Sequence, residues 1–518
     1  MGDVSLEWLD VAIFLAFFAF VVGISLVKSR RERNCEDYFL AGRGLTWPLI
    51  GFSIVAANLS TEQFVGMAGQ SAGDVGLAVS AWQLTGSIGI VIIEFTILPR
   101  FLKAGIYTMP EYLEYRYNAA ARGIMALFTT IIYVMVTITA VLYSGGLALK
   151  TIFGLQLTHA IWIIGGIATI YTVWGGLKAI AWADLFQGAA LMIGGLVTMF
   201  LGMQACGGAG AFFEQNAARL HMILPASHPA LPWTGVLAGM WIPIVYYCGL
   251  NQFIVQRTLA ARDLRQGQLG IVFAAALWLL VPFAIVLPGI MAQQLYGGTL
   301  GSPDEAYPTL IRRLIPIGVR GFLFAAIAGA VISSLASMLN SAATIFTMDL
   351  YHRHWQPQAS QRSLVLLGRG LTLLFVITGC LLAPAVAHPK FKGVFNFIQE
   401  FQGYISPGIV AAFVVGFVLP RAPRTAGVVA LLVSAPIYGG LHLFCGAGTQ
   451  HELHYLVRML LTFVAVALIM WMMTLAAPLP EPRKIPVRAD FNAASSPLAM
   501  VLGGFVIAAV VAFFVVFW

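Results

Sequence analysis

Two stretches of sequence decide the fold: IVAANLSTEQFVG at Ile54–Gly66 and IVYYCGLNQF at Ile244–Phe253. Each places small and polar residues in the middle of an apolar run, and these are Asn58, Ser60, Thr61, Gln63, Gly249, Asn251 and Gln252. In lipid, backbone groups released from a helix need partners inside the protein or in a water-filled cavity. We therefore interpret both stretches as breaks in membrane helices at a binding site. Close packing of small residues is the alternative for either stretch taken alone.

The composition around these stretches is that of a membrane protein. Of the 518 residues, 59% are hydrophobic and 10% are charged, whereas a soluble domain has about 25% charged residues. The mean hydropathy is +0.87. These values exclude a soluble enzyme, a disordered chain and a nucleic-acid binder. The five cysteines are scattered, without the spacing of a metal site or a CxxC motif, and we interpret them as apolar fillers.

Apolar runs along the chain predict about fourteen transmembrane helices, because a spanning helix needs about 20 apolar residues. No basic segment precedes the first run and no cleavage motif follows it, so we expect it to be a retained helix. The predicted spans are 8–27, 47–69, 76–99, 121–149, 158–174, 180–204, 233–256, 269–293, 316–348, 364–385, 395–419, 425–446, 453–476 and 497–518.

Under this assignment of spans, the Lys and Arg residues are unequally distributed between the two sides of the membrane. If the first span runs inward, 21 of the 29 Lys and Arg residues fall on the cytoplasmic side and 8 on the opposite side. This bias follows the positive-inside rule. It predicts a multi-pass protein of the plasma (bacterial inner) membrane with both termini outside, and it explains the net charge of +8 by topology.

The two interrupted spans are the second and the seventh, so they occupy equivalent places in two halves of five helices. Matching interruptions in inverted repeats are the best sequence indication of a secondary transporter's site. We expect a single transport domain over residues 1–518. It has an extra N-terminal helix and inner loop at 1–45, a first repeat at 46–204, a second repeat at 233–421, and extra C-terminal helices at 422–518.

The ninth span carries serines at helical spacing. Ser333, Ser337 and Ser341 lie on successive turns of one face, and Ser334 is adjacent. Sodium prefers oxygen ligands, and hydroxyls together with the carbonyls of a broken helix can form a cage for it. A stripe of small packing residues is the competing explanation, and it would be favoured for this span alone.

Three acidic residues of the spans need placing: Glu62, Glu94 and Asp184. Because intramembrane carboxylates are rare and usually functional, each needs an explanation. Glu62 lies at the first break, and Glu94 is near the inner end of the third span, where it could simply reach the interface. Asp184, in the sixth span, is either a waypoint for a leaving cation or the partner of an internal arginine, and both interpretations stay open.

Seven segments together resemble the sodium/solute symporter family along nearly the whole chain, most closely the bacterial sodium/galactose symporters of the sodium–glucose cotransporter branch. The segments are EDYFLAGRGLTW (Glu36–Trp47), AANLSTEQFVGM (Ala56–Met67), GIYTMPEYLEYRYN (Gly105–Asn118), VWGGLKAIAWADLFQ (Val173–Gln187), YYCGLNQFIVQRTLAA (Tyr246–Ala261), SSLASMLNSAATIFTMDLY (Ser333–Tyr351) and FIQEFQGYISPG (Phe397–Gly408).

The resemblance implies an all-α membrane fold of fourteen helices with a five-plus-five inverted-repeat, leucine-transporter-like core. It places Asp184 on the sodium exit path. Ala336 stands where some members have a hydroxyl of a second sodium site, which favours one sodium ion per cycle. The implied site for Na+, the coupling ion, consists of Ala56, Leu59, Ala330, Ser333 and Ser334.

The resemblance also implies a solute site, in which Gln83 stands where the galactose symporters have a glutamate, Ile244 replaces an asparagine and Trp278 a lysine. The pocket has thereby lost a carboxylate, an amide and an ammonium group and gained an indole, which can stack on a sugar. The absence of Lys and Arg disfavours carboxylate solutes. The implied solute residues are Gln63, Gln83, Ile244, Tyr247, Trp278 and Gln399, and the gates are Met67, Trp82, Phe395 and Tyr247.

Together these features predict sodium-coupled symport of a small sugar or polyol. A symporter of an amino acid, a nucleoside or a short organic acid is the closest alternative, and a sugar sensor without transport is another. A membrane enzyme is disfavoured because the histidines and carboxylates form no catalytic constellation. The expected partners are the solute and the lipid bilayer, with no nucleic acid and no obligate protein partner.

Overall fold

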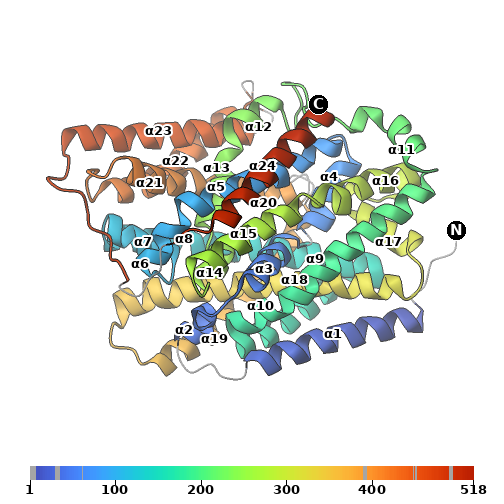
Figure 1. Cartoon of the computed structure of the whole chain (residues 1–518), viewed down its shortest axis with the longest axis horizontal. Coiled ribbons are helices and arrows are strands. Elements are labelled where there is room, and N and C mark those ends of the chain that lie inside the picture. Colours follow the sequence, from blue (N-terminus) through green and yellow to red (C-terminus); the bar gives the residue numbers. More distant parts are fainter. Residues whose placement is uncertain are drawn as a thin grey trace.

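A computed structural model describes residues 7–29, 35–60, 62–388, 394–446, 449, 452–488 and 494–518. Thr61, at the first predicted break, lies outside them. The described elements are helices, apart from an isolated bridge between Leu45 and Ala261. The long helices run side by side along the longest axis of the molecule, and the start of α1 and the end of α24 both lie in the right-hand half of the view, away from α6 and α7 (Figure 1).

The elements of the N-terminal half are α1 (Trp8–Ser29), α2 (Cys35–Leu40), η1 (Ala41–Arg43), α3 (Trp47–Asn58), η2 (Glu62–Met67), α4 (Ala68–Ala72), η3 (Gly76–Ser80), α5 (Ala81–Thr96), α6 (Leu98–Ala104), α7 (Met109–Arg116), α8 (Ala119–Ile132), η4 (Tyr133–Ile138), α9 (Thr139–Phe153), α10 (Leu157–Ala205), α11 (Ala209–Gln215), η5 (Ala217–Arg219), α12 (Trp233–Gly239), α13 (Trp241–Val245), η6 (Tyr246–Leu250) and α14 (Gln252–Leu259).

Those that follow are α15 (Leu264–Trp278), η7 (Pro282–Val286), α16 (Leu287–Tyr296), η8 (Gly297–Thr299), η9 (Pro303–Glu305), α17 (Ala306–Leu314), α18 (Val319–Ile345), η10 (Phe346–Trp355), α19 (Gln361–Leu382), η11 (Ala383–Ala387), α20 (Val394–Gln402), α21 (Ser406–Val418), α22 (Ala426–Cys445), α23 (Tyr455–Ala476) and α24 (Pro497–Val516).

The number of spans depends on how broken helices are counted. Within the described residues, 10 helices are long and apolar enough to cross a membrane, or up to 12 if each bent pair is one span. The predicted count of fourteen is therefore not confirmed. The predicted spans 47–69 and 158–174 coincide with the shorter apolar helices Trp47–Asn58 and Leu157–Ile170. The first ends where the backbone leaves the regular helix at Leu59, and α10 is interrupted at Gly176 (φ 50°, ψ −168°), between the predicted spans 158–174 and 180–204.

The N-terminal helix α1 is attached to the core by a buried ion pair. The Asp10 carboxylate accepts hydrogen bonds from Arg320 Nε at 2.9 Å and from the N–H groups of Gly318 and Gly321 at 2.8 and 3.1 Å. A side chain at Gly321 would collide with the Asp10 backbone. The carboxylate therefore satisfies N–H groups at the start of α18 that have no partner within that helix.

Close packing of α16 against α4 generates a prediction. A Cβ at Gly289 would overlap the Ser71 hydroxyl and the Ala68 carbonyl, so Gly289→Ala must push α16 away from the outer half of the first broken helix. We expect a loss of about 2 kcal/mol of stability, because overpacking of this kind costs about 1–3 kcal/mol. The measurement is the midpoint of unfolding of the purified protein in detergent.

The matched control is Gly166→Ala in α10, where an added Cβ meets nothing within 4 Å. We expect this variant to unfold at the wild-type midpoint or slightly above it, since Ala is a better helix former than Gly. Equal destabilisation by the two substitutions would contradict the assigned contact.

Candidate functional site

The first broken helix leaves helical geometry at Leu59. Its φ and ψ angles are −81° and 70°, although its N–H still donates to the Val55 carbonyl. The side chains that follow satisfy the released backbone groups. The Glu62 N–H donates to the Ser60 hydroxyl at 3.1 Å, and the Ser60 N–H donates to the Gln63 side-chain oxygen at 3.1 Å. The polar residues of this stretch therefore hold the break open rather than merely permitting close packing.

The second broken helix is interrupted at Asn251, which is extended (φ −83°, ψ 118°) between η6 and α14. Tyr133 of η4 satisfies this break from the opposite side of the core. Its hydroxyl donates to the Asn251 side-chain oxygen and accepts from the Phe253 N–H at 3.1 Å. Sequence reasoning missed Tyr133, and the available signal was a tyrosine within an apolar span.

A cavity lies between the two breaks. Every residue predicted to bind solute or to form a gate lines it, and it also borders residues that were not predicted. Its lining consists of Asn58, Glu62, Gln63, Met67, Trp82, Gln83, Gly86, Pro243, Ile244, Tyr247, Cys248, Trp278, Phe395, Gln399 and Gln402. The roles of the predicted residues remain proposals, since a common lining does not establish a ligand.

A chain of amide hydrogen bonds joins three elements across this cavity. Gln83 of α5 donates to the Asn58 side-chain oxygen, and Asn58 at the end of α3 donates to the Tyr247 hydroxyl at 3.0 Å. Asn58 and Gln83 are buried. The chain fixes the position of Tyr247, a predicted gate, relative to the first break.

Two buried polar atoms belong to lining residues and have no hydrogen-bond partner within the part of the chain that the structure describes. They are Trp278 Nε1 and Gln399 Oε1. Buried polar atoms are almost always paired, so this donor and this acceptor can serve a ligand. The cavity also contains the Glu62 carboxyl group. Glu62 is not the position at which the pocket was expected to have lost a carboxylate. That position is Gln83, which also lines the cavity, so the expectation stays a prediction.

Aromatic rings border the cavity at two places. Trp82 packs edge-on against Phe395 with ring centroids 5.4 Å apart, and it stacks with Tyr455 at 6.5 Å. At the second place, Tyr247 packs edge-on against Phe253 at 5.6 Å. Phe395 belongs to α20 and Trp82 to α5, so movement between these helices would open the cavity.

The residues predicted to bind sodium lie on two helices that touch. The Ser334 hydroxyl of α18 lies 3.1 Å from the Ala56 carbonyl oxygen and 3.2 Å from that of Ala57. Leu59 and Ala330 are buried in the same two helical segments. A hydroxyl beside carbonyls released at a break is an oxygen set that fits a sodium ion as cargo.

The Ser333 hydroxyl points elsewhere and bonds the Asp184 carboxylate. Asp184 also forms an ion pair with Arg257 at 3.2 Å and accepts from the Ser53 hydroxyl. The predicted seventh span, 233–256, stops just before Arg257 and so leaves this residue in the loop that follows. The prediction is wrong, since Arg257 is buried in α14, where its Nη2 donates to Ser337 Oγ at 2.6 Å. Of the two interpretations of Asp184, the structure supplies the internal arginine.

The serine face of α18 continues this polar contact towards the end of the bundle. The Ser341 hydroxyl donates to the Gln256 side-chain oxygen at 2.6 Å, and Gln256 donates to the Phe39 carbonyl at 2.6 Å. Ser337 and Ser341 therefore bind side chains of α14. By contrast, Glu94 does not reach the interface as one interpretation expected. It is buried within the protein, and neither of its side-chain oxygens has a partner among the described residues.

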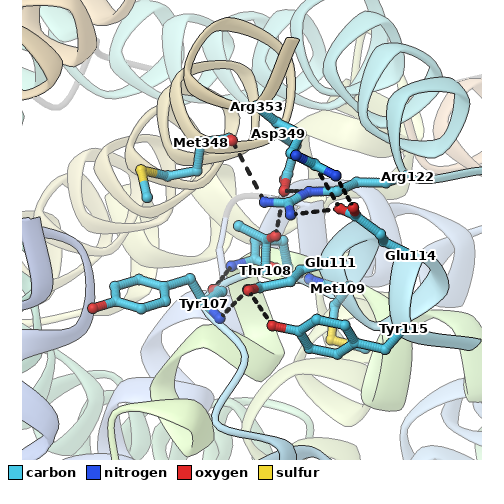
Figure 2. Close-up of polar contacts among 11 residues, drawn as sticks. Tyr107, Thr108, Met109, Glu111, Glu114, Tyr115, Arg122, Met348, Asp349 and Arg353 are labelled. Carbon is cyan, nitrogen blue, oxygen red and sulfur yellow. Dashed lines mark hydrogen bonds and ion pairs between the residues drawn. The ribbon is translucent and has the colours of Figure 1, made fainter. Parts of the chain in front are cut away.

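A polar cluster joins α7, α8 and η10 (Figure 2). Arg122 bridges Asp349 at 2.7 Å and Glu114 at 2.9 Å, and Arg353 also pairs with Glu114. The Thr108 hydroxyl donates to Asp349 at 2.7 Å. Burial alone would raise the pKa of Glu114, but the hydrogen bonds from Arg353 and Arg122 outweigh it and hold this pKa below its usual value.

Gln252 connects this cluster to the second break. Its side-chain oxygen accepts from the Met109 N–H at 2.9 Å, and its amide nitrogen donates to the Tyr107 carbonyl at 3.1 Å. Tyr107 is held in turn by Glu111, which accepts from its N–H at 2.7 Å. The start of α14 is thus tied to the chain that leads into α7.

Two broken helices that line one cavity, in a bundle of apolar helices, define a secondary transporter. The chain belongs to the sodium:solute symporter family, whose profile matches residues 38–433. It is a multi-pass membrane symporter and not an enzyme, and the family implies coupling to sodium.

Named relatives and a solved structure agree with this assignment. The chain is 39% identical to a sodium/glucose cotransporter of Vibrio parahaemolyticus, over 83% of this chain and 84% of the relative. It is 33% identical to sodium/myo-inositol cotransporter 2 of Sus scrofa, over 80% and 66%. A substrate-bound, outward-open Na+-coupled sialic acid symporter matches with a TM-score of 0.80 at 21% identity, over 91% of this chain and 98% of that one. This likeness confirms the predicted all-helical, leucine-transporter-like fold with its inverted-repeat core.

The buried ion pair generates a prediction. Asp184→Ala leaves the Arg257 guanidinium buried without a counter-charge, and we expect a loss of roughly 3–5 kcal/mol in the free energy of unfolding. The double variant Asp184→Leu with Arg257→Met removes both charges, so it should lose much less. Unfolding in detergent with a chemical denaturant measures both.

The control is Arg353→Gln, because Arg353 pairs with Glu114 but its side chain is 46% exposed. We expect less than about 1 kcal/mol there. A double variant as unstable as the sum of its single substitutions would contradict a direct interaction between Asp184 and Arg257.

Proposed function

We propose that this protein carries a small neutral sugar or polyol into the cell together with sodium, by alternating access to the cavity between its two broken helices. One observation supports this most directly. The cavity is lined by residues of both broken helices, and it borders the aromatic residues Trp82, Phe395 and Tyr247 that are predicted as gates. Such a site can be opened to either side by moving one set of helices against the other.

The chemistry of the cavity favours a neutral, polyhydroxylated solute. Among the described lining residues there is no Lys or Arg, so the carboxylate of an organic acid or amino acid would lack a counter-charge. The unpartnered Trp278 N–H and Gln399 carbonyl supply one donor and one acceptor, and the indole supplies an apolar face for a ring. Two relatives are named as cotransporters of glucose and of myo-inositol, and both of these solutes are cyclic and polyhydroxylated.

We further propose that sodium is cotransported through the oxygens of Ala56, Leu59, Ala330 and Ser334. The fifth predicted ligand, Ser333, bonds Asp184 in the arrangement described here. The contact of Ser334 with Ala56 joins α3 to α18, so a cation there would favour the arrangement in which these helices touch. Coupling then follows from a difference in affinity between conformations. The membrane potential contributes about 2.3 kcal/mol per charge per 100 mV.

The membrane and the orientation belong to this proposal. We propose that the protein lies in the plasma membrane. By the excess of positive charge, the end of the bundle with α6 and α7 would face the cytoplasm. The start of α1 and the end of α24, which lie in the half of the view away from α6 and α7 (Figure 1), would then be outside.

Removal of the indole donor tests the solute site. Trp278→Phe keeps a ring and removes Nε1, so we expect the KM for the solute to rise about tenfold, as for one lost hydrogen bond of about 1.4 kcal/mol, with an unchanged sodium requirement. Uptake of glucose, galactose, myo-inositol and amino acids into proteoliposomes identifies the solute and gives the KM.

The control for this substitution is Trp471→Phe, on α23, where the side chain is 49% exposed. Equal effects of the two substitutions would contradict the assigned site. Sodium-dependent uptake restricted to amino acids would overturn the sugar or polyol assignment, and binding without uptake would indicate a sensor.

Removal of one hydroxyl tests the sodium site. Ser334→Ala deletes an oxygen beside the released carbonyls, and we expect the sodium concentration for half-maximal uptake to rise about tenfold or more, because a hydrogen bond to a charged group is worth roughly 1.5–3 kcal/mol. Ser25→Ala in α1 is the matched control, since Ser25 is a buried serine that donates only to Val21 of its own helix. Unchanged sodium dependence in Ser334→Ala would disprove the assigned site.

A further inference from the structure

A second cavity lies at the end of the bundle that carries α6 and α7. Its volume is about 340 Å³. It is enclosed by α6, α7, the end of α21 and the segment at 483–487, which connects α23 to α24. It shares no lining residue with the cavity between the broken helices, so it has no place in the proposed transport site.

Four cationic side chains border this cavity: Arg100, Lys103, Arg116 and Arg483. None of its described lining residues is a carboxylate. The acidic residues of α7 are engaged on another face of that helix. Glu114 pairs with arginines, and Glu111 binds the Tyr107 N–H and the Tyr115 hydroxyl (Figure 2). Among the described residues, therefore, no carboxylate faces these cations on the cavity side.

The buried member of the group binds only neutral oxygens and a ring. Arg116 donates to the carbonyl oxygens of Gly416, Leu419 and Ala422 at 2.9, 2.7 and 3.3 Å. These contacts cap the C-terminal end of α21, where carbonyl groups are unsatisfied and cations are favoured. Burial, and to a smaller extent repulsion from the Arg483 cation, lowers the pKa of Arg116. Arg116 therefore fixes one wall of the cavity.

The other three cations leave their charges available. Arg483 Nε donates to the Tyr115 carbonyl at 3.2 Å, and the Arg100 guanidinium lies 4.5 Å from the centre of the Phe417 ring. Arg100 and Lys103 are exposed, and Arg483 is half-buried. Guanidinium and ammonium groups converging in this way match the oxygens of a phosphate.

The cavity is also bordered by apolar side chains at the ends of membrane helices. Phe417 lies in the last turn of α21 and Pro420 just after it, and Ile485, Pro486 and Val487 precede α24. Val487 is 60% exposed. An apolar edge beside a cationic hollow, at the level where spans end, is typical of a site for an anionic phospholipid.

We propose that this cavity binds the phosphate head group of an anionic phospholipid, with Arg100, Lys103 and Arg483 as its cationic ligands and the apolar edge against the glycerol and upper acyl chain. A bound head group would join α6, α7, α21 and the segment before α24. Through α7 it would steady the Tyr107–Met109 chain that holds Gln252 of the second broken helix.

The test uses the purified full-length protein with phosphatidylglycerol as the probe. Native mass spectrometry measures retained lipid, and thermal unfolding is followed in phosphatidylcholine vesicles with and without phosphatidylglycerol. Each cation near the membrane surface contributes roughly fivefold in affinity. We therefore expect about fivefold weaker retention in Arg100→Gln or Lys103→Gln, and loss on the order of 100-fold when Arg483→Gln is added to both. Phosphatidylglycerol should raise the unfolding midpoint of the wild type but not of the triple variant.

The charge-matched control is the triple variant Arg262→Gln, Arg265→Gln, Arg362→Gln, which removes three exposed cations away from the cavity and should retain lipid like the wild type. The single substitutions, both at exposed positions, keep the test decisive if the triple variant fails to fold. Equal lipid retention in the single cavity variants and the control would overturn the proposal. Stabilisation by inorganic phosphate alone, with no response to phosphatidylglycerol, would overturn the lipid as its source.

Discussion

The structure depends on one constraint: backbone groups released inside a bilayer must find partners within the protein. The two broken helices meet it in different ways. The first uses its own side chains, with Ser60 and Gln63 binding the N–H groups that follow Leu59. The second uses Tyr133, which reaches Asn251 from another helix. The cavity lies between the breaks because the residues that satisfy them also turn polar groups towards it.

A charged network lies beside the first break. Burial of two isolated charges is costly, and a buried pair is tolerated when further hydrogen bonds complete it. Asp184 and Arg257 are completed by Ser53, Ser333 and Ser337, so four helical segments share one polar centre. The neighbouring hydroxyl on α18 faces the released carbonyls instead. Adjacent serines thus divide between an internal ion pair and a set of oxygens that suits a cation.

Helix α7 and the chain that precedes it connect the cavity lined by Arg100, Lys103, Arg116 and Arg483 to the second break. One face carries Glu111 and Glu114 towards the arginines of the polar cluster, while Tyr112 and Arg116 face the basic cavity. The chain just before α7 holds Gln252 through two backbone contacts. An amphipathic helix at the membrane surface can in this way connect its interfacial surroundings to a transport pathway.

The sequence by itself determined the membrane class, the positions of the breaks and the family. Apolar length and polar interruption are local properties, and the motifs match position by position. It also named the predicted solute and gate residues that line one cavity, although their roles stay predictions. Only the tertiary structure decided that Arg257 is buried against Asp184, that Tyr133 satisfies the second break, that Glu62 faces the cavity and that Glu94 is enclosed. Asp184 and Arg257 are 73 residues apart and Tyr133 and Asn251 are 118 apart. Pairing at such separations is set by the packing of whole helices, which no local pattern in a single sequence encodes.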